Sequence, residues 1–173
     1  MIRRIGIVVL AVVLQVSVSV VSFADPATAQ TATACTASSG TVTLVPGWSP
    51  TGPREMQHIT VEGSLGDCTG PVSSGTVAAH LMSTFSQSCD TLTEPTEARG
   101  TGKLGWNTGI PSKLTSDFAM YESGMSANFN GTITGGQFSG LALIATFTLT
   151  PTSGNCTTTP VTQLSYVGTA KIK

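Results

Sequence analysis

Glycine and proline divide this chain into short runs of apolar residues. The sequence contains 19 Gly and 9 Pro, and the runs between them are rich in Val, Ile, Thr and Phe, without sustained helical spacing. Gly and Pro interrupt helices, whereas short alternating runs bounded by turn residues are typical of strands. In residues 137–150, the side chains of Leu141, Leu143, Phe147 and Leu149 all fall on one face of an extended chain.

Eight segments fit this description of a strand. They are Thr41–Val45, Met56–Ser64, Thr76–Phe85, Ala98–Trp106, Leu114–Met120, Ser126–Thr134, Gln137–Thr150 and Val161–Ile172. Short strands at such spacing predict an all-β fold, either an antiparallel β-barrel or a β-sandwich. Residues 30–40 are expected to be a tail that runs into the first strand.

Residues 1–29 are predicted to be a signal peptide. Arg3 and Arg4 form a positive start, and residues 5–21 contain no charged side chain, which is the organisation of a secretory signal. Small residues favour cleavage after Ala29, with Ala24 as the second site. The apolar stretch is shorter than the ~20 residues of a membrane span. Residues 30–173 are therefore expected to form a single secreted, extracellular domain with no membrane attachment after cleavage.

The four cysteines, at positions 35, 68, 89 and 156, are expected to form two disulfides in an oxidising compartment. Cys35 follows small residues, as a lipid-modified cysteine does, but its lipidation would leave an odd number of thiols. Four cysteines allow three pairings, and the order of the residues along the chain does not by itself choose among them.

An internal repeat relates residues 40–105 to residues 106–173. The aligned pairs include Gly63 with Gly131, Gly75 with Gly140, Phe85 with Phe147 and Cys89 with Cys156. Cys35 and Cys68 have no counterparts in the second half. We therefore predict that the two equivalent cysteines bond to each other and that the unmatched ones bond locally, which gives Cys35–Cys68 and Cys89–Cys156.

Charged residues make up only 10% of the chain, against about 25% in typical soluble domains. Without the signal peptide, which carries Arg3, Arg4 and Asp25, six basic and eight acidic residues remain. No run of Lys or Arg is present, and binding to phosphates needs clustered cations. Nucleic-acid binding is therefore not expected.

No constellation of residues predicts a catalytic or metal site. His58 and Glu62 share the outer face of the segment 56–64, where a solvated polar surface is expected, and His80 has no second ligand at metal-site spacing. Neither Gly-x-Ser-x-Gly nor Ser-x-x-Lys occurs. We expect no catalytic residue, no metal and no cofactor. A secreted hydrolase that uses His58 or scattered carboxylates is the first alternative.

Three aromatic residues are the predicted binding residues. Trp48 lies in a proline-flanked loop, Trp106 at the end of a strand, and Tyr121 in a turn. An exposed aromatic ring on a loop is a rigid anchor for a ligand. The other interpretation is that each Trp packs inside one end of the β domain.

Several short motifs resemble those of small secreted β-rich proteins of actinobacteria whose functions are not assigned. They are Gly-x-Leu-x-x-Cys at 63–68, Ser-Cys-Asp-Thr-Leu at 88–92, Gly-Trp at 105–106 and Gly-Gly-x-Phe-x-Gly at 135–140. The resemblance implies secretion and a β fold, and it supplies no functional residues.

Taken together, these features predict a secreted, monomeric, non-enzymatic binding or interaction module. Its extracellular ligand or protein partner would be a cell-surface component, a glycan or a small apolar molecule, bound by loops at one end or in a cavity between the halves. The second alternative is a protease inhibitor that presents the loop Thr51–Met56.

Overall fold

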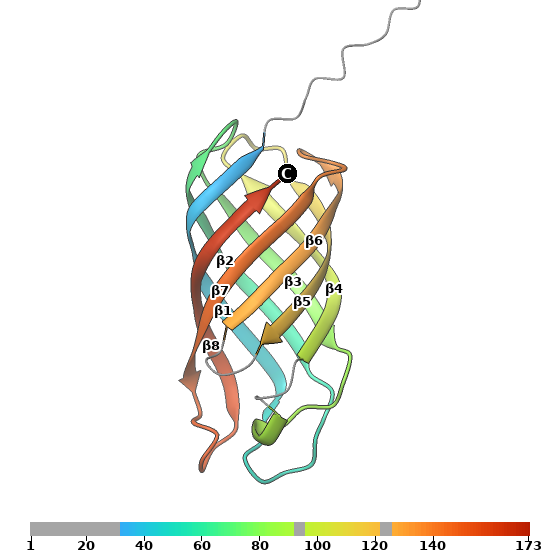
Figure 1. Ribbon diagram of the computed structural model, residues 1–173, viewed down its shortest axis with the longest axis vertical. Helices are drawn as coiled ribbons and strands as arrows, with labels where there is room; N and C mark the ends of the chain where they lie inside the picture. Colours follow the sequence, from blue (N-terminus) through green and yellow to red (C-terminus); the bar gives the residue numbers. More distant parts are fainter. Residues whose placement is uncertain (1–31, 92–95, 122–125) are drawn as a thin grey trace, which may run out of the picture.

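The structure is a computed structural model in which eight antiparallel strands form one closed barrel (Figure 1). It describes residues 32–91, 96–121 and 126–173, without the side chains of residues 91, 96 and 117–121. The strands are β1 (Thr33–Trp48), β2 (His58–Thr69), β3 (Gly75–Ser83), β4 (Thr96–Trp106), β5 (Ser112–Tyr121), β6 (Ser126–Gly136), β7 (Ala142–Ser153) and β8 (Val161–Ile172). The predicted all-β class is confirmed, and of the two predicted architectures the chain adopts the barrel.

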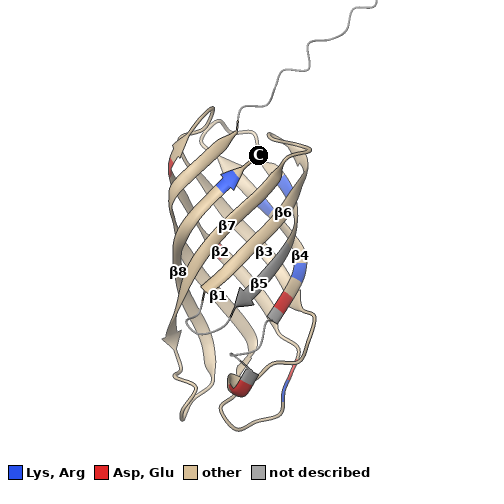
Figure 2. Ribbon diagram, viewed as in Figure 1, with Lys and Arg blue, Asp and Glu red and all other residues tan. Residues whose placement is uncertain are grey.

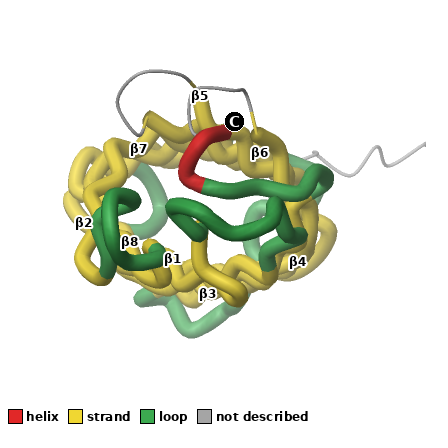
Figure 3. Tube along the Cα trace, turned by 90° about the horizontal axis from the view of Figure 1, so that it is seen from below, coloured by secondary structure: helices red, strands yellow, loops and turns green. Residues whose placement is uncertain are grey.

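Each strand pairs with the next strand along the sequence, and β8 returns to pair with β1. The chain therefore runs up and down around the barrel. In the orientation of Figure 1, the C-terminus and the loops that follow β2, β4 and β6 lie at the upper end. The loops that follow β1, β3 and β7 lie at the lower end, where the short 3₁₀ helix Cys89–Thr91 is also found. Viewed from below, these loops cross the mouth of the barrel (Figure 3).

Alternation of side chains explains why the strands close into a barrel. In β3, Val77, Ala79 and Leu81 are buried inside, while the residues between them are exposed. The predicted inward face of β7 is also buried, at Leu143, Ala145, Phe147 and Leu149. A strand of this kind has one apolar face, and closing the sheet on itself buries all eight such faces in one core.

The predicted starts of the first and the seventh strand are wrong. The segment 33–40, expected to belong to a tail, is the first half of β1, because it pairs with β2 on one side and β8 on the other. Its small polar residues carry little strand signal, and its partners lie far away in the sequence. Residues 137–141, expected to begin a strand, form a turn in which Phe138 and Gly140 have positive φ angles of 65° and 89°.

The predicted internal repeat would divide the barrel into β1–β4 and β5–β8. In the observed register, Gly100 of β4 lies opposite Ser116, and Gly168 of β8 lies opposite Ser38. The aligned Gly100 and Gly168 thus occupy comparable places, each beside a buried serine. The duplication itself stays a prediction.

Figure 2 shows that the charged residues are thinly spread over the strands. The outer wall instead carries Thr, Ser and Asn on strands such as β6 and β7. Within the described ranges, no helix has both the length and the apolar character needed to cross a membrane.

Candidate functional site

All four cysteines are paired, as Cys35–Cys68 and Cys89–Cys156, which confirms the predicted connectivity. Cys35 and Cys68 are register partners on β1 and β2, near the upper end. Cys89 begins the 3₁₀ helix, and Cys156 lies in the loop between β7 and β8. The second disulfide therefore joins two loops of the lower end and limits their movement relative to each other.

Trp48 is buried, so of its two interpretations the structure shows internal packing and not an exposed anchor on a loop. It is the last residue of β1 and is only 1% exposed. Its Nε1 donates a hydrogen bond to Oε1 of Gln87, 3.0 Å away. Residues 84–91 follow β3 at the lower end, and Gln87 is buried together with the indole. The indole thus helps to close the lower end of the barrel.

Trp106 is also buried, at 6% exposure, and plays the corresponding part at the upper end. Its Nε1 donates to Oγ of Ser112 at 2.9 Å, and its ring meets the ring of Phe138 edge-on, with centroids 5.3 Å apart. The sequence left two interpretations of these tryptophans, and the internal-packing one is observed for both. The third predicted binding residue, Tyr121, ends β5, and its side chain lies outside the described part of the structure.

The polar face predicted for β2 is present but forms no evident site. His58 and Glu62 are exposed on the outer wall while Ile59 and Val61 point inward. Across the described ranges, no three or more His, Cys, Asp or Glu side chains are grouped so that they could hold a metal ion. Nothing in this face therefore distinguishes it from an ordinary solvated strand.

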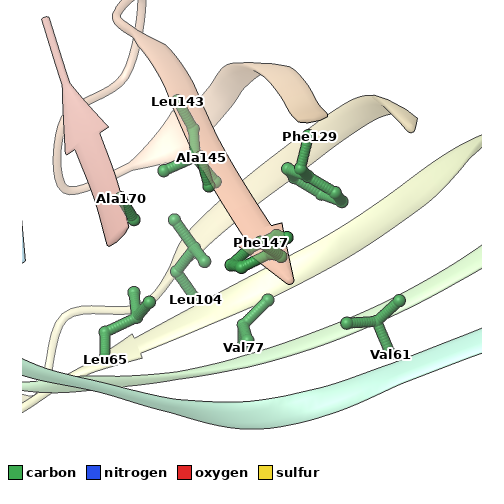
Figure 4. A pocket seen from close by; sticks show the side chains of 9 residues that line it. All are labelled: Val61, Leu65, Val77, Leu104, Phe129, Leu143, Ala145, Phe147 and Ala170. Atoms are coloured by element: carbon green, nitrogen blue, oxygen red, sulfur yellow. The ribbon is translucent and has the colours of Figure 1, made fainter. Parts of the chain in front are cut away.

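Side chains of the described residues leave little space in one part of the barrel interior. Figure 4 shows the residues around an apolar void there, which are Val61, Leu65, Val77, Leu104, Phe129, Leu143, Ala145, Phe147 and Ala170. The void measures about 10 Å³, which is at the lower limit for a single water molecule. Its lining is apolar throughout. Among the residues that the structure describes, this void is too small to hold a small-molecule ligand.

Tyr166 is one of the largest fully buried side chains of the barrel. Its ring lies against Gly40 and Gly63, where an added Cβ would collide with it, and its centroid lies 4.7 Å from that of Phe147. Burial raises the pKa of Tyr166 to about 12, and the nearby Ser38 hydroxyl offsets part of the rise. Apart from each other, the two buried hydroxyl groups have no hydrogen-bond partner among the described residues.

The loop between β1 and β2, residues 49–57, is held firmly at its first end. The carbonyl oxygen of Ser49 accepts a hydrogen bond from the backbone N–H of Cys89 at 3.1 Å. The hydroxyl of Ser49 accepts another from the N–H of Gly52 at 2.8 Å. The start of this loop is thus fixed by the buried Trp48 beside it and by the disulfide-bonded Cys89.

The other end of the same loop is fixed more extensively. Glu55 and Gln87 exchange two backbone hydrogen bonds, of 3.1 and 2.7 Å. Gln57 is fully buried, its N–H donates to Oγ of Ser83 at 2.8 Å, and its carbonyl oxygen accepts from the N–H of Ser83 at 2.9 Å. Residues 51–56 are therefore a short exposed stretch anchored at both ends, with only Gly52 partly covered.

Three large apolar side chains are exposed beside this loop. They are Met56 at 42%, Met82 at 46% and Phe85 at 63%. Met82 lies on β3 opposite His58, and His58 follows Met56 by two residues. Phe85 lies two residues after the end of β3. We call these three residues the rim patch. The alternation of β3 places Met82 outside, but sequence reasoning did not identify the patch. It placed Met56 and Phe85 at the ends of predicted strands, whereas both residues lie in loops.

Comparisons with known proteins identify no relative: no family model matches the chain, and neither the curated proteins nor the solved structures give a significant match. A function must therefore be argued from the site itself.

Proposed function

We propose that this protein is a secreted, non-enzymatic binding module that recognises a protein partner with the lower end of its barrel. The observation that carries this proposal is the rim patch, three exposed apolar side chains next to a loop anchored at both ends. Large apolar side chains held out into water on a rigid support are typical of sites that another protein covers.

Rigidity supports the proposal on energetic grounds. Ordering a mobile loop on binding costs about 0.5–1.5 kcal/mol for each immobilised side chain. Here the disulfide Cys89–Cys156 and the Glu55–Gln87 hydrogen bonds hold the loops in place before any partner arrives. Most of that ordering has already taken place during folding, so the contacts contribute more directly to affinity.

The small size of the described interior void favours a partner that binds outside the barrel. A void of about 10 Å³ is far smaller than a ligand pocket. The exposed Met and Phe side chains of the rim patch suit a protein surface, since apolar and aromatic residues are enriched at the centres of protein interfaces. Two disulfides and no free thiol also suit an extracellular location.

Binding of the purified protein to surface and secreted protein fractions of its own producing cells would test this proposal. We expect the variant Met82→Ser/Phe85→Ser to lose most of the binding of the parent protein. The matched control is Ile110→Ser/Val167→Ser, which removes two comparably exposed apolar side chains away from the lower end. Equal binding by the parent and the Met82/Phe85 variant, or no binding by the parent, would overturn the proposal.

A further inference from the structure

We infer that the loop Thr51–Met56 enters the active-site cleft of a serine endopeptidase as a slowly cleaved, substrate-like inhibitor, with Arg54 in the pocket that selects basic side chains. This inference rests on the proposed function and names the class of its partner. The loop is exposed at Thr51 and from Pro53 to Met56, so a cleft can reach it without unfolding the barrel.

The backbone of the loop is arranged as a protease requires. Glu55 and Gln57 direct their N–H and C=O groups inward, to Gln87 and Ser83. In a trans peptide group the N–H and C=O point to opposite sides, so the C=O of Arg54 and both backbone groups of Met56 face outward. Proteins that bind an extended peptide pair with its outward-facing backbone groups and take alternate side chains into pockets. The internal hydrogen bonds of Glu55 and Gln57 can therefore persist while a protease is bound.

The anchoring of Glu55 also provides a reason for slow cleavage. A protease serine hydroxyl that attacks the Arg54 carbonyl carbon forms an ester, breaks the Arg54–Glu55 peptide bond and passes its proton to the Glu55 amine. That nitrogen is hydrogen-bonded to the carbonyl oxygen of Gln87 at 3.1 Å. The amine therefore stays beside the ester, where it can re-form the peptide bond and return the proton before water hydrolyses the ester. Holding two reacting groups together in this way favours their recombination.

The two ends of the loop are also connected to each other by buried hydrogen bonds to one residue, Gln87. Trp48 at the start and Gln57 at the end are both buried, and Gln87 bonds to each of them, through Trp48 Nε1 at 3.0 Å and Gln57 Nε2 at 3.4 Å. Hydrolysis of the exposed stretch would leave both new ends attached to one packed cluster. The rim patch lies next to the loop and offers the protease additional contact area outside its cleft.

Arg54 is the side chain that decides the class of protease. A guanidinium is permanently charged and forms bidentate hydrogen bonds with a carboxylate, so it fits a specificity pocket that has a carboxylate at its base. Glu55 and Pro53 flank it, and neither side chain suits that pocket.

Titration of trypsin with the disulfide-intact protein tests the inference, with residual activity measured on a small arginine substrate. We expect stoichiometric inhibition, with the Arg54–Glu55 bond still largely intact by mass spectrometry after prolonged incubation. Arg54→Lys should inhibit within about tenfold of the parent, and Arg54→Ala should weaken inhibition by about 100-fold or more, as expected for a central contact residue. The matched control Arg99→Ala, which changes an exposed arginine on β4, should inhibit like the parent.

Three results would overturn the inference: no inhibition of trypsin, rapid cleavage after Arg54, or inhibition that Arg54→Ala does not weaken. Thermal unfolding of each variant separates loss of the loop from loss of the fold. Failure of the protease inference can be told apart from failure of the proposed function. If only the protease inference fails, the Met82→Ser/Phe85→Ser variant still loses binding to the cellular fractions. If the proposed function fails, this variant binds the fractions like the parent protein.

Discussion

Trp48 donates its indole N–H to the side-chain oxygen of Gln87, which lies 39 residues further along the chain. This hydrogen bond joins the end of β1 to the segment that follows β3, under the loop that we assign to partner binding. The same Gln87 also pairs through its backbone with Glu55. Gln87 therefore links the buried Trp48 to the exposed loop 51–56, so a substitution at either place should alter the structure at the other.

Substitution of Trp48 should chiefly affect stability. Trp48→Ala removes a fully buried indole, and we expect a loss of about 3–5 kcal/mol in the free energy of unfolding. Trp48→Phe keeps most of the apolar volume but leaves the Gln87 oxygen without its donor, for which we expect about 1–3 kcal/mol. Denaturant unfolding measures both losses. A fully stable Trp48→Ala variant would contradict the internal position of this indole.

Substitution of Gly63 should be among the most damaging single changes in the barrel wall. A Cβ at this position would collide with the Tyr166 hydroxyl and with the carbonyl oxygen of Ser39. We expect Gly63→Ala to lower the free energy of unfolding by about 3 kcal/mol, because overpacking against backbone cannot be relieved by a rotamer change. Gly135→Ala is the control, since its Cβ would meet only the Lys113 side chain, 3.9 Å away. Similar thermal midpoints for the two variants would contradict this packing.

Tyr166 should make the stability of the protein depend on alkaline pH. Its pKa is raised by burial from 10.0 to about 12, so in that range the folded state keeps a proton that the unfolded state releases. The contribution of Tyr166 to the free energy of unfolding is fully present below pH 10 and is lost as the pH rises through about 12. In this range the free energy of unfolding falls by at most about 1.4 kcal/mol per pH unit because of this one group.

The variant Tyr166→Phe isolates this effect, because it lacks the titrating hydroxyl and keeps the ring. Denaturant unfolding between pH 10 and pH 12 should show a shallower loss of stability for this variant than for the parent protein. The phenolate absorbance of the folded parent should also rise late in this range. Parallel stability curves for the two proteins would mean that Tyr166 is not protected from water.

The two disulfides should differ in what they support. Replacement of either pair by serines should lower the free energy of unfolding by about 4 kcal/mol, since each closes a loop of 33 or 67 residues in the unfolded chain. Only the loss of Cys89–Cys156 should also weaken partner binding and protease inhibition. Removal of Cys35–Cys68, at the other end, should leave both largely unchanged at temperatures where the variant is folded. Equal effects of the two pairs on binding would contradict our assignment of the lower end.

Much of this architecture follows from the sequence alone. The alternation of apolar residues in β3 and β7 predicts which side chains point inward, because successive side chains of a strand lie on opposite faces. The internal similarity that aligns Cys89 with Cys156 leads to the observed disulfides. These features could be predicted because each depends on local backbone geometry or on a comparison within the chain.

The tertiary structure alone decided three features: closure of the barrel, burial of both tryptophans, and formation of the lower-end site. Closure depends on β1 pairing with β8, and these partners lie more than a hundred residues apart without any local signal for their register. Trp48 is buried because residues 84–91, from a distant part of the chain, cover it and supply Gln87 as its hydrogen-bond acceptor. The exposure of a loop side chain depends on which other loops fold over it. The sequence of the loop has no periodic pattern from which this exposure could be predicted.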